Sequence, residues 1–271
     1  MKKCTAIIIY SALFFLFACN MDKKENTAQL SSIEEKSITI DTIRIHEQYT
    51  FAYDKENAPN LTIDITLPRF DLGNEQATAR LDSTLAWGLF FSDAPTLKDA
   101  CNFYVAAKKE LFDILRNEYH NLKESEIPPG MMNCYCDVKG RTVEGYKGYI
   151  SHIMTCEEYY GGAHPTTFNT IACFDPATGA EITLKDIFNE GYEETLATRL
   201  IDRLLKDNNV STIYELCNKG YSLDIDFFIT NNFILGNDSM TFLYNRYEIA
   251  PYAMGDILIT LDYETLKEIM K

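Results

Sequence analysis

The residues best suited to binding chemistry lie in the segment 157–175, which reads EEYYGGAHPTTFNTIACFD. Tyr159 and Tyr160 can stack on a ligand or hydrogen-bond to it, and His164 follows a Gly-Gly pair typical of a tight turn. The segment fits a ligand-binding rim that presents these side chains. It also fits a hairpin whose glycines set the turn, with one tyrosine packed inward.

A second aromatic cluster, NRYEIAPYAMGD, occupies residues 245–256. Tyr247 and Tyr252 flank Pro251, and Gly255 closes the segment. A loop this aromatic fits a binding surface or an excursion that caps the core between two strands. Both interpretations stay open, and the candidate binding residues are Tyr159, Tyr160, His164, Tyr247 and Tyr252.

Known catalytic motifs are missing from the sequence. It has no G-x-S-x-G, no phosphate-binding G-x-x-x-x-G-K-[ST], no G-x-G-x-x-G and no H-E-x-x-H. A zinc site could be assembled in space from His152 or His164 with Glu157 or Glu158, but the spacing of the four histidines does not favour it. We therefore predict no catalytic residue, no metal and no cofactor.

The first residues predict export. A basic start, Met1-Lys2-Lys3, precedes an apolar run from Thr5 to Ala18 that is too short to span a bilayer permanently. Leu16-Phe17-Ala18-Cys19 resembles the lipobox of bacterial lipoproteins. That resemblance implies a signal peptide over residues 1–18, acyl chains such as palmitate on Cys19, and anchoring in the cell envelope, at the outer membrane. The alternative is an ordinary cleaved signal with an incidental cysteine.

Residues 19–37 are polar and without a hydrophobic period, which predicts a flexible tether. The chain has a formal charge of −15, and removal of Lys2 and Lys3 with the leader makes it −17. Such acidity disfavours nucleic acid and favours a basic partner. Six cysteines lie beyond Cys19 and permit either up to three disulfides or free core thiols: Cys101, Cys134, Cys136, Cys156, Cys173 and Cys217.

Alternation and helical periods predict an α+β fold, with mainly antiparallel sheets packed against a few amphipathic helices in two sequential subdomains. Strands are expected over 37–67, 142–175 and in the last fifty residues, there at DFFIT, NFILG, MTFLYN and DILITLDY. Helices are expected at 74–91, at 96–121 and between 184 and 220. The second of these is expected to bury a stripe of Ala100, Phe103, Tyr104, Ala107, Leu111, Ile114 and Leu115.

The motifs YYGGAHP, FDPATGAEITLKDIF and YEIAPYAMG, in this order, resemble the RsiV-like family. That family includes the extracytoplasmic domain of the lysozyme-sensing anti-sigma-V factor, and a similar domain accompanies PdaC-type peptidoglycan deacetylases. The resemblance implies an RsiV-like domain over residues 161–271 and its usual α+β partner domain over residues 38–160. Neither sigma-factor regulation nor deacetylation transfers, because the segments that perform them have no counterpart here.

The resulting prediction is an envelope-anchored, non-catalytic binding module whose ligand is a basic protein such as lysozyme or a cell-wall glycan. A glycan hydrolase that uses carboxylates near the His164 hairpin is the alternative from a different class. A purely structural lipoprotein is the third possibility.

Overall fold

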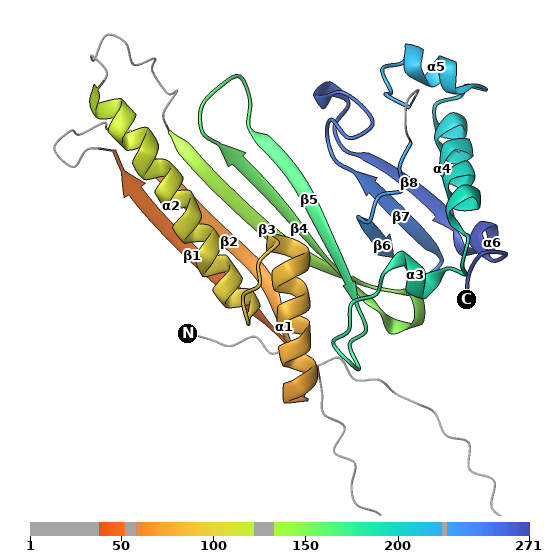
Figure 1. Cartoon of the computed structure of the whole chain (residues 1–271), viewed down its shortest axis with the longest axis horizontal. Helices are drawn as coiled ribbons and strands as arrows, with labels where there is room; N and C mark the ends of the chain where they lie inside the picture. Colours follow the sequence, from red (N-terminus) through yellow and green to blue (C-terminus); the bar gives the residue numbers. More distant parts are fainter. Residues whose placement is uncertain (1–37, 52–57, 59, 122–132, 224–226) are drawn as a thin grey trace, which may run out of the picture.

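The computed structural model describes residues 38–51, 58, 60–121, 133–223 and 227–271. The predictions for the signal peptide, Cys19 and the tether lie outside these residues. The described chain forms two sheets, each with its own helices, one after the other along the sequence (Figure 1). This is the α+β architecture with two subdomains that the sequence predicts.

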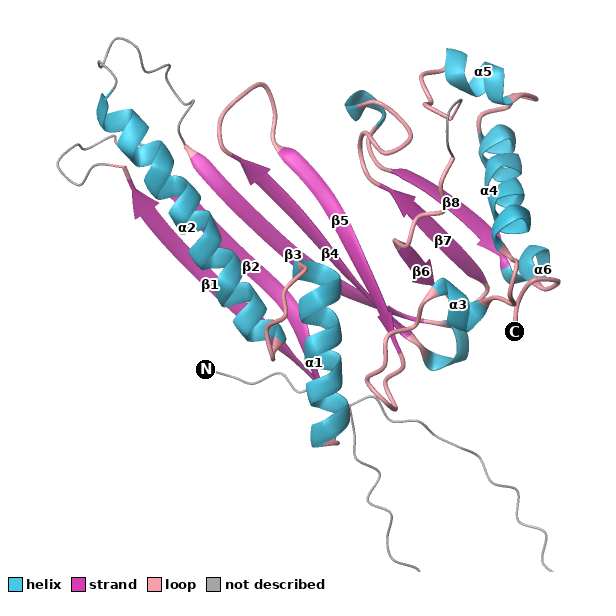
Figure 2. Cartoon of the chain, viewed as in Figure 1, coloured by secondary structure: helices cyan, strands magenta, loops and turns pink. Residues whose placement is uncertain are grey.

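The first sheet has five strands in the order β1–β2–β3–β4–β5. Their bounds are Thr39–Thr50, Asn60–Asp71, Cys134–Glu144, Ile150–Tyr159 and Thr166–Phe174. All neighbours are antiparallel except β2 and β3, which run parallel. A parallel pair needs a crossover, and helices α1 (Glu75–Phe90) and α2 (Leu97–Asn121) provide it while covering one face of the sheet (Figure 2).

Helix α1 follows the predicted pattern. Ala77, Leu81, Leu85 and Leu89 are buried at helical spacing against the sheet. The side chain of Asn74 accepts a hydrogen bond from the backbone N–H of Ala77 and so caps the first turn.

Helix α2 buries only part of the predicted stripe. Ala100 is buried, and Tyr104 and Leu115 are partly buried against the core. Phe103 is 60% exposed and Ile114 is 53% exposed, while Leu97, Cys101 and Phe112 are buried. The buried side of the helix also holds a charge: Lys108 Nζ lies 2.8 Å from Glu158 Oε2 on β4. Because the sheet supplies a carboxylate for this lysine, the helix can turn a charged residue inward and leave apolar residues in solvent.

The second sheet is antiparallel, in the order β6 (Phe233–Leu235), β7 (Ser239–Tyr244) and β8 (Ile257–Asp262). The helices of this unit are α3 (Leu184–Ile187), α4 (Glu193–Asp207), α5 (Ile213–Asn218) and α6 (Tyr263–Leu266). Helix α4 buries Leu196, Leu200 and Leu204 in the core of this unit. Helix α5 begins with the predicted capping box of Thr212 and Glu215.

The predicted strand DFFIT is wrong for its described part, since residues 227–230 form no strand. Phe227 and Phe228 pack on the ring of Tyr244, with ring centroids 5.7 and 5.5 Å away. The hydroxyl of Tyr244 donates to the carbonyl oxygen of Phe228 at 2.8 Å. The Tyr244 hydroxyl therefore occupies the carbonyl oxygen of Phe228 that a neighbouring strand would bond in a sheet.

The two units share side chains at β4 and β5. Ile153, Ile171 and Cys173 belong to the core of the second unit, although their strands belong to the first sheet. The predicted boundary between residues 160 and 161 falls in the turn between β4 and β5, which pair along their whole length. Division by sheets places the change of unit after β5.

Two further findings concern the cysteines and the described helices. All six cysteines from Cys101 to Cys217 are free thiols, and five of them are buried. Within the described ranges, the helices are too short or too polar to cross a membrane.

Candidate functional site

The candidate site begins on the face of the first sheet that points away from α1 and α2. Side chains alternate along a strand, so Cys136 and Cys156 face the helices while Tyr135, Glu157 and Tyr159 face the other way. Tyr135 on β3 is directly opposite Tyr159 on β4. Their rings stack with centroids 6.0 Å apart and an interplanar angle of 28°.

The β4–β5 turn and the loop after β7 meet beside this face. The His164 ring stacks on the Tyr252 ring, with centroids 3.9 Å apart and planes 21° apart. The hydroxyl of Tyr252 donates to the carbonyl oxygen of Pro165 at 3.2 Å. The centroid of Tyr247 lies 5.8 Å from that of Tyr252. We call the set Tyr135, Tyr159, His164, Tyr247 and Tyr252 the tyrosine face.

Charged groups hold the rings of the tyrosine face. Glu157 accepts a 2.7 Å hydrogen bond from the hydroxyl of Tyr135, and this bond raises the pKa of Tyr135 to about 12. The guanidinium of Arg246 lies 4.7 Å from the centroid of Tyr252 and donates to its hydroxyl at 3.2 Å. Tyr252 is therefore in contact with both an imidazole and a guanidinium.

Tyr247 is the most accessible tyrosine of the face. Its side chain is 67% exposed, and its backbone has a φ of 71°. A left-handed conformation is unfavourable for a bulky residue, and here the N–H of Tyr247 donates to the carbonyl oxygen of Ala250 at 2.9 Å. The loop thus holds a large aromatic side chain in solvent, which is the arrangement expected of a contact residue.

The structure brings four of the five candidate residues together and separates the fifth. Tyr160 lies on the helix side of the sheet, where its hydroxyl is 3.0 Å from the Cys136 thiol and its ring lies under the Lys108 ammonium. Burial raises the pKa of Tyr160 above its usual value. Tyr160 is thus packed under α2, away from the tyrosine face.

His152 and the carboxylates of β4 do not form one site. His152 is fully buried on the helix side, and Glu157 is on the opposite side of the strand. Glu158 shares the helix side but lies six residues further along, where it binds Lys108. No cluster of three metal-ligating side chains exists in the described part of the chain. Glu157 accepts bonds from Tyr135 and, at 3.4 Å, from Thr167, so the arrangement supports stacking and hydrogen bonding to a ligand.

Sequence reasoning missed Tyr135 and Arg246. Tyr135 comes from NCYCD, where alternation predicts a side for each residue but not the register against β4. Arg246 precedes the predicted Tyr247, and this adjacency in sequence was the only signal that could have identified it as a site residue.

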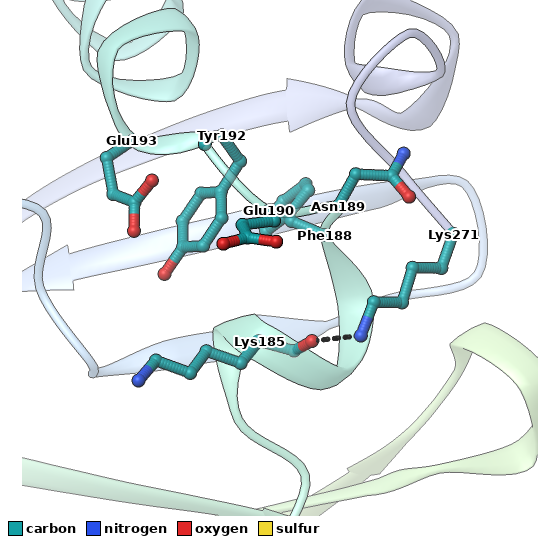
Figure 3. A pocket seen from close by; sticks show the side chains of 8 residues that line it. Lys185, Phe188, Asn189, Glu190, Tyr192, Glu193 and Lys271 are labelled. Carbon is teal, nitrogen blue, oxygen red and sulfur yellow. Dashed lines mark hydrogen bonds between the residues drawn. The ribbon is translucent and has the colours of Figure 1, made fainter.

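A separate pocket of about 430 Å³ lies in the second unit (Figure 3). Phe188 and Tyr192 stack in its wall, with centroids 5.1 Å apart. The Lys271 ammonium donates to the carbonyl oxygen of Lys185 across it. The full lining is Lys185, Phe188, Asn189, Glu190, Gly191, Tyr192, Glu193 and Lys271. Seven of the eight lining residues lie between Lys185 and Glu193, and Lys271 joins them from the end of the chain. The segment contains no histidine and matches no known binding motif, so the sequence did not predict the pocket.

The fold and the tyrosine face define a two-sheet α+β protein with an aromatic surface spanning both units. Residues 185–264 match the family model described as "Protein of unknown function (DUF3298)". This part of the second unit is therefore similar to the DUF3298 family. Among curated proteins, none matches the chain significantly.

Two solved structures are similar over most of the chain. The first is a member of the DUF3298 family from Bacteroides fragilis NCTC 9343, with 26% identity and a TM-score of 0.73 over 88% of this chain and 95% of that one. The second is a DUF3298 family protein from Pseudomonas aeruginosa PAO1, with 18% identity and a TM-score of 0.56 over 86% of this chain and 94% of that one. The second likeness concerns the fold alone.

Proposed function

We propose that the protein is an exported, RsiV-like lipoprotein, anchored to the outer membrane through Cys19, that binds a partner without catalysis. The partner binds the tyrosine face and is a basic protein such as lysozyme. The lipobox-like Leu16–Cys19 supports the anchor, and the order of the motifs YYGGAHP and YEIAPYAMG supports the RsiV-like relationship.

The observation that carries the proposal is a pair of neighbouring aromatic groups. Tyr252 packs against His164 and the exposed Tyr247. It also lies near enough to the stacked pair of Tyr135 and Tyr159 to act electrostatically on Tyr135. Tyrosine and arginine are enriched among the residues that dominate protein–protein binding energy. The rings of the tyrosine face are already held by hydrogen bonds and stacking. Binding a partner therefore has to order fewer side chains than it would on a mobile surface.

Charge supports a basic partner. The whole chain carries −15, and −17 without Lys2 and Lys3. A field of this sign accelerates encounter with a cationic protein and weakens as salt is added. Glu157 and Glu248 place carboxylates on or beside the tyrosine face itself.

A cell-wall glycan is the second candidate ligand. The near-parallel stack of Tyr135 and Tyr159 supports it, because tyrosine rings can stack on sugar rings as they do on aromatic ligands. A glycan hydrolase would need Glu157 as an acid or nucleophile. Turnover of peptidoglycan by the wild-type protein, lost in Glu157→Gln, would favour the hydrolase over the binding module.

A pull-down with lysozyme across a salt series tests the proposal. We expect retention at low ionic strength that falls steeply between 50 and about 300 mM salt, because long-range attraction is screened over a shorter Debye length. A carbohydrate column of cell-wall glycan serves as the parallel arm. No retention of lysozyme at the lowest salt would reject the basic-protein partner, and retention by the glycan arm alone would replace it with the glycan.

A further inference from the structure

Two asparagine side chains complete the outer edge of β5. Asn245, at the start of the loop after β7, accepts from the backbone N–H of Asn169 at 2.6 Å and donates to its carbonyl oxygen at 3.0 Å. One side-chain amide thus makes the two hydrogen bonds that a residue of a neighbouring strand would make.

Asn232, just before β6, also makes two such bonds, but to two different residues of the strand. Its Oδ1 accepts from the N–H of Ile171 at 3.0 Å, and its Nδ2 donates to the carbonyl oxygen of Asn169 at 3.2 Å. β5 is the last strand of the first sheet, so its outer backbone groups would otherwise lack strand partners. The second unit supplies these partners from side chains instead of a sixth strand.

Asn169 also holds the far end of the loop. Its Nδ2 donates to Oδ2 of Asp256 at 3.0 Å, while its Oδ1 accepts from the Thr155 hydroxyl at 2.7 Å. The residue is only 7% exposed, and its backbone and side-chain polar groups all have partners. Both ends of the loop 245–256 are therefore tied to one residue of β5.

We propose that Asn169 and Asn245 are positioning residues that assemble the tyrosine face by clamping the loop 245–256 to β5. The clamp sets Tyr252 against His164 and so determines where Tyr247 is presented. The role in binding rests on the proposed function, whereas the positioning of the rings does not.

Because of the clamp, the tyrosine face forms only when both units are present and packed together. The DUF3298 match, residues 185–264, contains Tyr247 and Tyr252 but neither His164 nor the strands that carry Tyr135 and Tyr159. A ligand that contacts both halves stabilises their junction, and by linkage a weaker junction lowers the affinity for that ligand.

The test compares Asn245→Ala with Asn232→Ala in the purified protein. The two residues share a type and a partner, but only Asn245 begins the loop that carries Tyr252. The readout is the NMR shift of the His164 ring protons, which stacking on Tyr252 at 3.9 Å moves upfield. His164→Gln assigns the signal, and Asn245→Asp, which keeps the acceptor but loses the donor, provides a milder variant.

We expect Asn245→Ala to abolish the upfield shift, Asn245→Asp to reduce it, and Asn232→Ala to preserve it at a similar loss of stability. Lysozyme affinity should fall about tenfold in Asn245→Ala, because two rings must then be ordered on binding. An unchanged shift in Asn245→Ala, or an equal loss in Asn232→Ala, would overturn the proposal. If the wild type binds no lysozyme, the proposed function fails, and the NMR comparison still decides the positioning claim.

Discussion

The buried His152 should make the fold sensitive to mild acid. Its Nε2 donates to the carbonyl oxygen of Pro68 at 3.0 Å, which leaves the buried Nδ1 without a hydrogen-bond partner. Burial lowers the pKa of His152 from 6.5 to about 4. The folded protein therefore keeps the ring neutral at pH values where the unfolded chain protonates it.

The sign and size follow from this difference. Above pH 6.5 the ring is neutral in both the folded and the unfolded state, so His152 contributes no pH dependence to the stability there. As the pH falls from 6.5 to about 4, only the unfolded state gains the proton, and the free energy of unfolding drops by about 3 kcal/mol. At pH 5 the loss from this group is about 2 kcal/mol.

Urea unfolding of the wild type and His152→Gln between pH 7.5 and pH 4.5 measures this loss. Glutamine can still donate to Pro68 but does not titrate, so the stability difference between the two proteins should shrink or reverse toward low pH. His46→Gln is the control, because His46 is exposed beside Asp64. Parallel pH profiles for the wild type and His152→Gln would refute the reasoning, since the folded state would then protonate as readily as the unfolded one.

Three further predictions concern packing and the thiols. Gly179→Ala should destabilise the protein by about 3 kcal/mol or more, because φ is 67° and a Cβ would lie 2.1 Å from the carbonyl oxygen of Ala77. Gly148→Ala, with φ of 77° and open space around the Cβ, should lose only about 1 kcal/mol, and equal losses in urea unfolding would contradict the steric argument. Lys108→Met should lose about 2 kcal/mol because it removes the cation from the Glu158 carboxylate, whose side chain is 15% exposed and which keeps the hydrogen bond from Tyr104, and Lys108→Met/Glu158→Gln should recover much of that loss. Failure of the double variant to recover would mean that the lysine acts by packing alone. In native thiol titration, Cys217 should react first of the six cysteines from Cys101 onward, since burial raises the pKa of Cys156 to about 12; early labelling of Cys156 would contradict its burial.

Local patterns predicted the elements well where the chain follows one rule over several turns. The spacing of Ala77, Leu81, Leu85 and Leu89 predicted α1, and the pair Thr212 and Glu215 predicted the start of α5. Both depend only on neighbours within a few residues. The α2 stripe was right for Ala100 and wrong for Phe103 and Ile114. The inward place of Lys108 depends on Glu158, fifty residues away, and apolar periodicity contains no information on such a pair.

The candidate site was predictable only where it depends on residues close together in the sequence. Adjacent residues of a strand face opposite sides, so only one of Tyr159 and Tyr160 can join a given surface. The sequence did not say which one, because the side depends on where the helices pack. Tyr135 could not be predicted as a site residue from the sequence, because its place beside Tyr159 depends on the register of β3 against β4.

The central claim is that the tyrosine face binds the partner, and calorimetric titration with lysozyme tests it most directly. Tyr247→Ala removes the 67% exposed ring of the face, and Tyr214→Ala removes a 75% exposed ring on α5 as the matched control. We expect Tyr247→Ala to weaken binding by about 30-fold, as a dominant contact residue does, and Tyr214→Ala to leave the Kd unchanged. Equal affinity of the Tyr247→Ala variant and the wild type would contradict the claim.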